Sequence, residues 1–184
     1  MTVGDQLNID YPVLPPSSNH IYYNRPGGGR ALTTKADNWQ KRFVAFVGQH
    51  YIFSIRKFQD VAGVGAVFTV EICLRLELAD VVNKGWVQRY KKDTWVGKKG
   101  TSARRMKRAG QRKAETRYKR LDVSNRFKLL EDSASLALGV GDLHHFGIGG
   151  SKIVVDDDAV GVTVVIVEDD PRAYGIPEEY LDGP

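Results

Sequence analysis

The segment RLDVSNRFKLLEDSASLALGVGD, residues 120–142, combines a helical pattern with a spaced set of charges. Its apolar residues recur at three- and four-residue steps, which is the spacing of one face of an α-helix. These residues are Phe127, Leu130, Ala134, Ala137 and Leu138. Ser124 or Asn125 is a suitable N-cap, and Gly139 is suited to end the helix. We therefore predict a helix within residues 121–138, with its cap at Ser124 or Asn125.

The other side of this predicted helix is polar. It carries Lys128, Glu131, Asp132 and Ser135. Lys128 and Asp132 are one turn apart and can form an ion pair. Asp122 precedes the helix, and Asp142 follows it. Two interpretations fit this pattern: an amphipathic helix with a solvated charged face, or the acids and lysine of a site that cuts phosphodiesters with a metal ion.

A strongly basic segment comes directly before the helix. From Lys98 to Arg120 there are 11 Lys or Arg and one acid, Glu115, a local net charge of +10. The whole chain has a net charge of +5, so the remainder carries 5 − 10 = −5. A nearly pure positive segment favours a polyanionic partner, most often nucleic acid. We interpret residues 94–120 as a flexible arm that DNA orders, the alternative being a surface loop that is basic for solubility.

Length and composition indicate one globular domain over residues 1–184. The hydrophobic fraction of 42% and the aromatic fraction of 10% are ordinary for such a domain. No apolar run approaches the roughly 20 residues that span a bilayer, and residues 1–9 lack the features of a secretory signal. The single Cys73 lies in an apolar pattern, which predicts a buried thiol and fits a reducing cytoplasm.

The fold class predicted is α+β, with a mixed β-sheet of about five strands packed by two main helices. Strict alternation of apolar and polar residues predicts a half-buried strand over residues 67–78. A first helix is predicted over residues 35–50, capped by Thr33 or Thr34. Its apolar face consists of Trp39, Phe43, Phe46 and Val47.

The N-terminal region gives weaker patterns. Residues 1–9 are expected to be irregular, a strand is expected over residues 11–14, and a short one over residues 20–23. Three consecutive glycines within residues 24–30 predict a loop. This loop lacks the Gly-Lys-Ser/Thr ending of a phosphate-binding loop.

Near the C-terminus, two β-branched runs at residues 151–155 and 160–167 predict a hairpin. The three aspartates between them, residues 156–158, are typical of a solvated turn rather than of a metal site. Residues 169–184 are predicted to form an acidic, irregular tail.

Two motifs lie in the same order as in one known family. Asp122-x-x-Asn125-x-x-Lys128-x-x-x-Asp132 is followed by Ala-Leu-Gly-Val and Asp142, and residues 11–20 read YPVLPPSSNH. Together they resemble the core signature and the opening Pro-Pro-Ser-x-Asn turn of the RusA family of Holliday-junction resolvases, in a phage-type variant. The resemblance covers roughly residues 9–168. The chain departs from the family pattern at Ser124 and Gly141, where the family has acids, so it has fewer metal ligands.

The resemblance implies a Mg²⁺-dependent endodeoxyribonuclease of DNA recombination and repair that resolves four-way junctions by paired, symmetric cuts. The implied catalytic residues are Asp122, Lys128 and Asp142, and the implied metal ligands are Asp122, Asp142 and Asp132. The residues expected to contact DNA are Asn19, Lys98, Lys99, Arg104, Arg105, Lys107, Arg108, Arg112, Lys113, Arg117, Lys119, Arg120 and Asn125. The implied partners are branched DNA, duplex DNA with weaker affinity, and a second copy of the chain, without any membrane. The implied location is the cytoplasm of a bacterial cell or a phage-infected host.

Alternatives remain at three points. The chain fits a non-catalytic DNA-binding protein with a decayed metal site, whereas RNA binding has no aromatic RNA-recognition motif to support it. His144 and His145 lack the further ligands of a zinc site.

A helix over residues 124–138 is roughly 22 Å long, so Asp122 and Asp142 lie off opposite ends. One metal ion takes both only if the chain doubles back or a second subunit supplies one acid.

Overall fold

The structure is a computed structural model that describes residues 6–17, 20–63, 65–83, 118, 124–141 and 144–178. The chain divides into two compact units. The main unit comprises Met1–Arg75, Asp122–Ile153 and Gly161–Pro184, and the smaller unit comprises Leu76–Leu121 and Val154–Val160. In the part of the chain that the structure describes, no helix is both long enough and apolar enough to cross a membrane.

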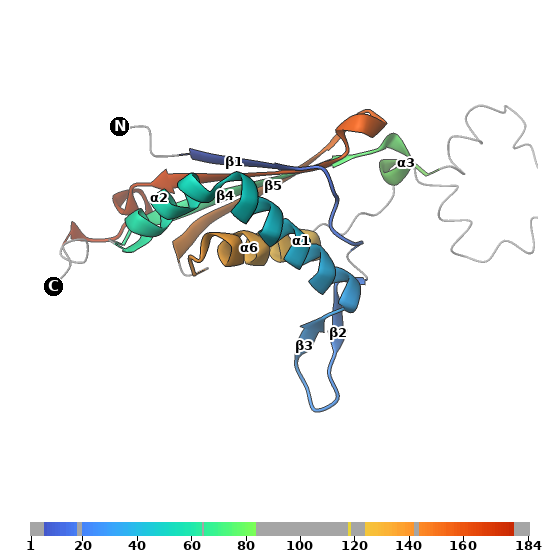
Figure 1. The fold of residues 1–184 in the computed structure, drawn as a ribbon, viewed down its shortest axis with the longest axis horizontal. Coiled ribbons are helices and arrows are strands. Elements are labelled where there is room, and N and C mark those ends of the chain that lie inside the picture. The colour runs from blue at the N-terminus through green and yellow to red at the C-terminus, as the bar shows by residue number, and fades with distance from the viewer. Residues whose placement is uncertain are drawn as a thin grey trace, which may run out of the picture. The chain divides into compact units, whose positions relative to one another are not determined.

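A four-stranded sheet organises the main unit (Figure 1). Its strands are β1 (Gln6–Tyr11), β4 (Val67–Leu76), β5 (His145–Val154) and β6 (Gly161–Asp169), in the spatial order β1-β6-β4-β5. β6 runs antiparallel to β1 and to β4. β5 runs parallel to β4, because His144 at its start bonds to Ala66 and Val155 past its end bonds to Leu76. The predicted α+β class with a mixed sheet is confirmed.

The sheet buries one face through the alternation that the sequence predicted. In β4, Phe68, Val70, Ile72, Leu74 and Leu76 are all buried. Their neighbours continue the same layer: Ile72 pairs with Val164 of β6, which pairs with Ile9 of β1, and each is at most 1% exposed. A row of β-branched side chains across three strands packs well on a pleated surface.

Three helices cover this buried face (Figure 1). They are α1 (Thr34–His50), α2 (Ile52–Gly63) and α6 (Ser124–Leu138). The α1 prediction is confirmed, including its cap, because Oγ1 of Thr33 accepts a hydrogen bond from the backbone N–H of Ala36 at 3.3 Å. α1 packs against α6, where Nε2 of Gln40 donates to Oγ of Ser133 at 3.3 Å. α2 was not predicted.

The first strand differs from its prediction. It covers Gln6–Tyr11, so most of it lies in residues 1–9, which were expected to be irregular. It ends at Tyr11, the residue at which a strand was expected to begin. The reason is a period-two pattern in which Leu7, Ile9 and Tyr11 are buried and the intervening residues are exposed.

The predicted C-terminal hairpin is wrong. β5 and β6 are consecutive in sequence, but β4 lies between them in the sheet. Val162, Val164 and Ile166 of β6 are fully buried, and a strand buried in this way gains most from a neighbour on each side. The intervening Asp157–Ala159 forms one exposed 3₁₀ turn, η4, as expected for a solvated run of carboxylates.

The glycine-rich loop is the turn of a small hairpin. β2 (Tyr22–Asn24) pairs antiparallel with β3 (Arg30–Leu32) to form a second, two-stranded sheet. Gly27, Gly28 and Gly29 all have positive φ values, of 95°, 100° and 83°, a conformation that residues with a Cβ rarely adopt. The backbone conformation at the tip of this hairpin therefore requires glycine.

The remaining described elements are short. In the smaller unit, α3 (Leu78–Val81) is followed by a bridge between Val82 and Tyr118, and Nδ2 of Asn83 donates to the carbonyl of Tyr118 at 3.2 Å. In the main unit, β6 is followed by the 3₁₀ turn η5 (Pro171–Tyr174).

Candidate active site on helix α6

Helix α6 carries the motif, and its two ends are fixed by specific contacts. Near its start, Phe127 packs directly on Gly150 of β5, so closely that a Cβ at Gly150 would overlap the aromatic ring. At its end, Gly139 adopts a φ of 66°, and the N–H of Val140 bonds to the carbonyl of Ser135 at 3.1 Å. This is a Schellman ending, and it confirms the helix end that the sequence predicted at Gly139.

Lys128 lies on the exposed side of α6 between two acids. Its Nζ lies 2.9 Å from Oδ1 of Asp132 and 3.4 Å from Oε2 of Glu131. The predicted pair between Lys128 and Asp132 is thus present. The Lys128 side chain is 49% exposed, so the pair with Asp132 lies at the protein surface.

The pKa of Lys128 is raised by these acids. The hydrogen bond to Asp132 is the largest cause, and the charges of Asp132 and Glu131 add to it, whereas partial burial works in the opposite direction. Lys128 therefore stays positively charged at every physiological pH, as a group that stabilises phosphate charge must.

Glu131 was predicted on the polar side of the helix, and the structure corrects this. Its side chain is only 8% exposed. Oε1 lies 3.6 Å from Nδ1 of His145, whose side chain is fully buried, and Oε2 faces Lys128. A buried carboxylate is costly unless a basic group compensates for it, and here Lys128 of α6 supplies the positive charge.

Tyr22 of β2 brings the small hairpin to the same cluster. Burial raises the pKa of its phenol, and the negative charge of Asp132 raises it further. The phenol, the Asp132 carboxylate and the Lys128 ammonium group are thus close enough to influence one another. We name Tyr22, Lys128, Glu131, Asp132 and His145 the α6 cluster.

The other predicted site residues are placed as follows. Asn125 lies in the first turn of α6 and is half-buried. The helix begins at Ser124, so neither Ser124 nor Asn125 occupies the cap position that was predicted for them. Asp122, Asp142, Asn19 and all the predicted arm residues from Lys98 to Arg120 lie outside the described residues.

The predicted metal ligands fit Mg²⁺ by their chemistry, because carboxylate oxygens are the donors that this ion prefers. Of the three, the structure describes Asp132, whose carboxylate pairs with Lys128. Within the described ranges, no three His, Cys, Asp or Glu side chains are grouped so as to hold a metal ion. His144 instead bonds through Nδ1 to the carbonyl of Ala66 at 2.9 Å.

No protein-family model matches the chain, and no curated protein matches it.

Sequence reasoning missed three members of the α6 cluster as site residues: Tyr22, Glu131 and His145. Glu131 did carry a signal, because the position three residues after Lys128 faces the same side of a helix. Tyr22 precedes α6 by about a hundred residues, and His145 follows the end of α6 in a strand, so no helical spacing could join either residue to the cluster.

Proposed function

We propose that this chain is a Mg²⁺-dependent endodeoxyribonuclease of the RusA type that resolves four-way DNA junctions by paired phosphodiester cuts. The observation that carries the proposal is the half-exposed Lys128 side chain, whose ammonium group is held by Asp132 and Glu131 on the helix that bears the motif. The basic segment Lys98–Arg120 directly precedes that motif in the sequence and supports a nucleic-acid partner.

Each residue has a distinct part in this proposal. Lys128 stabilises the negative charge that develops on the phosphate oxygens during hydrolysis. Glu131 holds Lys128 from the buried side. The lysine therefore keeps its position when Asp132 binds Mg²⁺ instead of Lys128. Asp122, Asp132 and Asp142 would hold the Mg²⁺ ion, which when bound stabilises phosphate charge and lowers the pKa of a water molecule.

The second candidate is a DNA-binding protein without nuclease activity. The observation that favours it is the pairing of Asp132 with Lys128, together with Ser124 and Gly141 at positions where the family has acids. The two candidates agree on DNA binding and differ only in hydrolysis.

A synthetic four-way junction separates them. If the chain is a nuclease, we expect symmetric cuts in two opposing strands with Mg²⁺, none with EDTA, and no cuts in a linear duplex of the same sequence.

Asp122→Asn should abolish cutting and preserve binding, because it removes a charge but little volume. Lys128→Ala should slow cutting more than it weakens binding. Junction binding without any cutting by the native protein would favour the second candidate.

A homodimer is part of the proposal, because a four-way junction presents two scissile strands related by two-fold symmetry. Asp122 and Asp142 lie at opposite ends of α6 in sequence, so a site shared between subunits is one arrangement. Refolding Asp122→Asn and Asp142→Asn proteins together tests it. A shared site leaves one intact site per heterodimer and restores single-strand nicking, whereas sites built within one subunit leave every site damaged. Sedimentation as a monomer at micromolar concentration would rule out both arrangements.

A further inference from the structure

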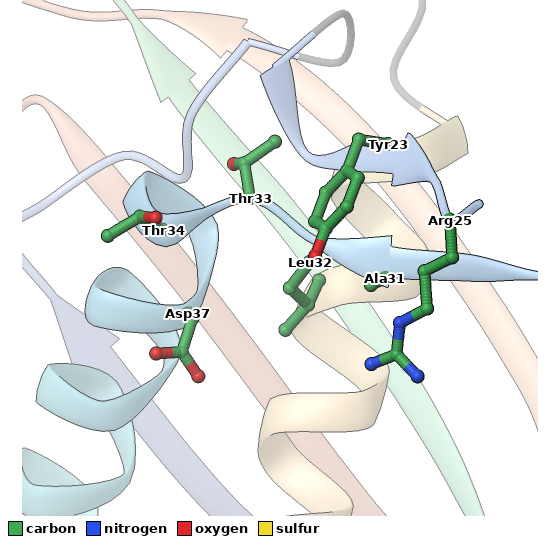
Figure 2. A pocket seen from close by; sticks show the side chains of 7 residues that line it. All are labelled: Tyr23, Arg25, Ala31, Leu32, Thr33, Thr34 and Asp37. Atoms are coloured by element: carbon green, nitrogen blue, oxygen red, sulfur yellow. The ribbon is translucent and has the colours of Figure 1, made fainter.

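A pocket outside the α6 cluster lies at the base of the β2–β3 hairpin (Figure 2). Its volume is about 580 Å³, within the range of about 300–1,000 Å³ that is usual for ligand sites. It is lined by Tyr23, Arg25, Ala31, Leu32, Thr33, Thr34 and Asp37. The hairpin and the first turns of α1 therefore form its walls.

The strand register explains why Tyr23, Arg25 and Ala31 meet. Tyr23 pairs with Ala31 across the hairpin, so both lie on the same face, and Arg25 follows two residues later on that face. Tyr22 lies on the opposite face, where its phenol is partly buried and near enough to Asp132 and Lys128 for their charges to alter its pKa. The hairpin is thus held on one face and leaves the Tyr23 face open.

The pocket combines the groups that bind a nucleotide. Tyr23 is 50% exposed and offers an aromatic ring for stacking, and Ala31 and Leu32 add apolar surface beside it. Figure 2 shows the guanidinium group of Arg25 and the carboxylate of Asp37 bordering the same space. A phosphate is attracted to Arg25, and the amino edge of a base can donate to Asp37.

The surroundings are positively charged. Residues 20–42 contain five Lys or Arg and one acid, Asp37, a net charge of +4. Asp37 itself is paired with Lys41 at 2.8 Å, so the acid does not repel a polyanion strongly. A strand of nucleic acid is favoured over an acidic small molecule, because the charge extends beyond the pocket along the hairpin and α1.

We propose that this pocket binds one unpaired nucleotide of a DNA strand, with the base stacked on Tyr23 and its phosphate on Arg25. The site deepens the proposed function, on which it rests, because branch points expose bases that a continuous duplex keeps stacked. The hairpin that carries it also places Tyr22 near Asp132 and Lys128, so a bound strand would be held near Lys128.

The test measures binding of the full-length protein in EDTA, where cutting is stopped. Fluorescence anisotropy with a labelled 12-nucleotide single strand should show roughly tenfold weaker binding for Tyr23→Leu, the usual loss for one stacked base. Tyr23→Phe keeps the aromatic ring, so this variant should bind the strand with native affinity. Phe53→Leu is the matched control, since Phe53 is 83% exposed on α2 and away from the pocket, and it should leave affinity unchanged. Thermal unfolding of each variant confirms that it is folded.

A strand with one 2-aminopurine reports stacking directly. Its fluorescence should change on binding to the native protein and to Tyr23→Phe, but not to Tyr23→Leu. Equal affinities of Tyr23→Leu and the native protein for the strand would overturn the inference about the pocket. The proposed function would still stand in that case if the native protein cuts the junction. Tyr23-dependent binding of dCMP as tight as that of the strand would overturn the assignment to a strand. Absence of all DNA binding would remove both proposals.

Discussion

Nζ of Lys128 lies 2.9 Å from Oδ1 of Asp132, one turn along the same helix, and this pair makes the stability of the protein depend on pH at alkaline values. The pKa of Lys128 in the folded protein is raised above its unfolded value, mainly by the hydrogen bond to Asp132. A raised lysine pKa contributes stability below the unfolded value of about 10.4, and this is lost as pH rises through the folded value.

The first prediction follows from the raised pKa of Lys128. Denaturant unfolding of the native protein and Lys128→Met should show a constant difference in free energy between pH 6 and pH 9, and the difference should shrink above about pH 10.4. Lys41→Met is the control, because Lys41 forms a similar pair with Asp37 but is 71% exposed. It should cost at most about 1 kcal/mol. A Lys128→Met difference that grows above pH 10.4 would contradict the assigned direction.

The second prediction concerns Tyr22 and Asp132. Because the charge of Asp132 adds to burial in raising the pKa of the Tyr22 phenol, Asp132→Asn should lower that pKa without returning it to the value of an exposed tyrosine. The measurement is an NMR titration of the tyrosine ring signals, assigned with Tyr22→Phe. An unchanged Tyr22 titration in Asp132→Asn would show that the hairpin is not held beside α6.

The third prediction uses two glycines. Gly150→Ala should destabilise the protein by about 1–3 kcal/mol, because the new methyl group meets the Phe127 ring that positions α6. Gly48→Ala, within α1 and with nothing within 4 Å of the added group, should instead stabilise it by about 0.5–1 kcal/mol. Chemical denaturation of both variants gives the comparison. Equal effects would mean that α6 does not pack on β5 as described.

Local patterns in the sequence were enough to predict β4, α1 and α6, since each has a single buried face repeated over at least ten residues. The arrangement of the strands was not predictable in this way. β6 lies between β1 and β4 through pairs such as Ile9 with Val164, whose positions are too far apart in the chain for any periodicity to connect.

The same limit applies to the site. Lys128 and Asp132 were paired correctly, because their spacing within one helix determines their contact. The burial of Glu131 was missed, because a charged residue is expected to face solvent unless its compensating partner is known. The group that covers it, His145, comes from a different element, and only the packing of α6 on β5 brings it close.

The fourth prediction concerns the basic segment. Replacing Arg104, Arg105, Lys107 and Arg108 with Gln should weaken binding to junction and to duplex DNA alike. The dependence of log affinity on log salt should flatten by about 0.9 for each phosphate that the protein no longer neutralises. Arg56→Gln, an exposed arginine on α2, is the control and should leave the slope unchanged. An unaltered slope in the fourfold variant would assign these residues to solubility.

The fifth prediction tests paired cutting itself, in a supercoiled plasmid that extrudes one cruciform. Two symmetric cuts within one binding event convert the plasmid to a linear molecule, whereas uncoordinated nicking releases the supercoiling, reabsorbs the cruciform and leaves a nicked circle. With Mg²⁺ the native protein should give linear product from the earliest times, and Asp122→Asn should give neither product while still retarding the plasmid in a gel. Nicked circles alone would contradict paired cutting by a dimer, and an uncut plasmid that the native protein binds would contradict the nuclease itself.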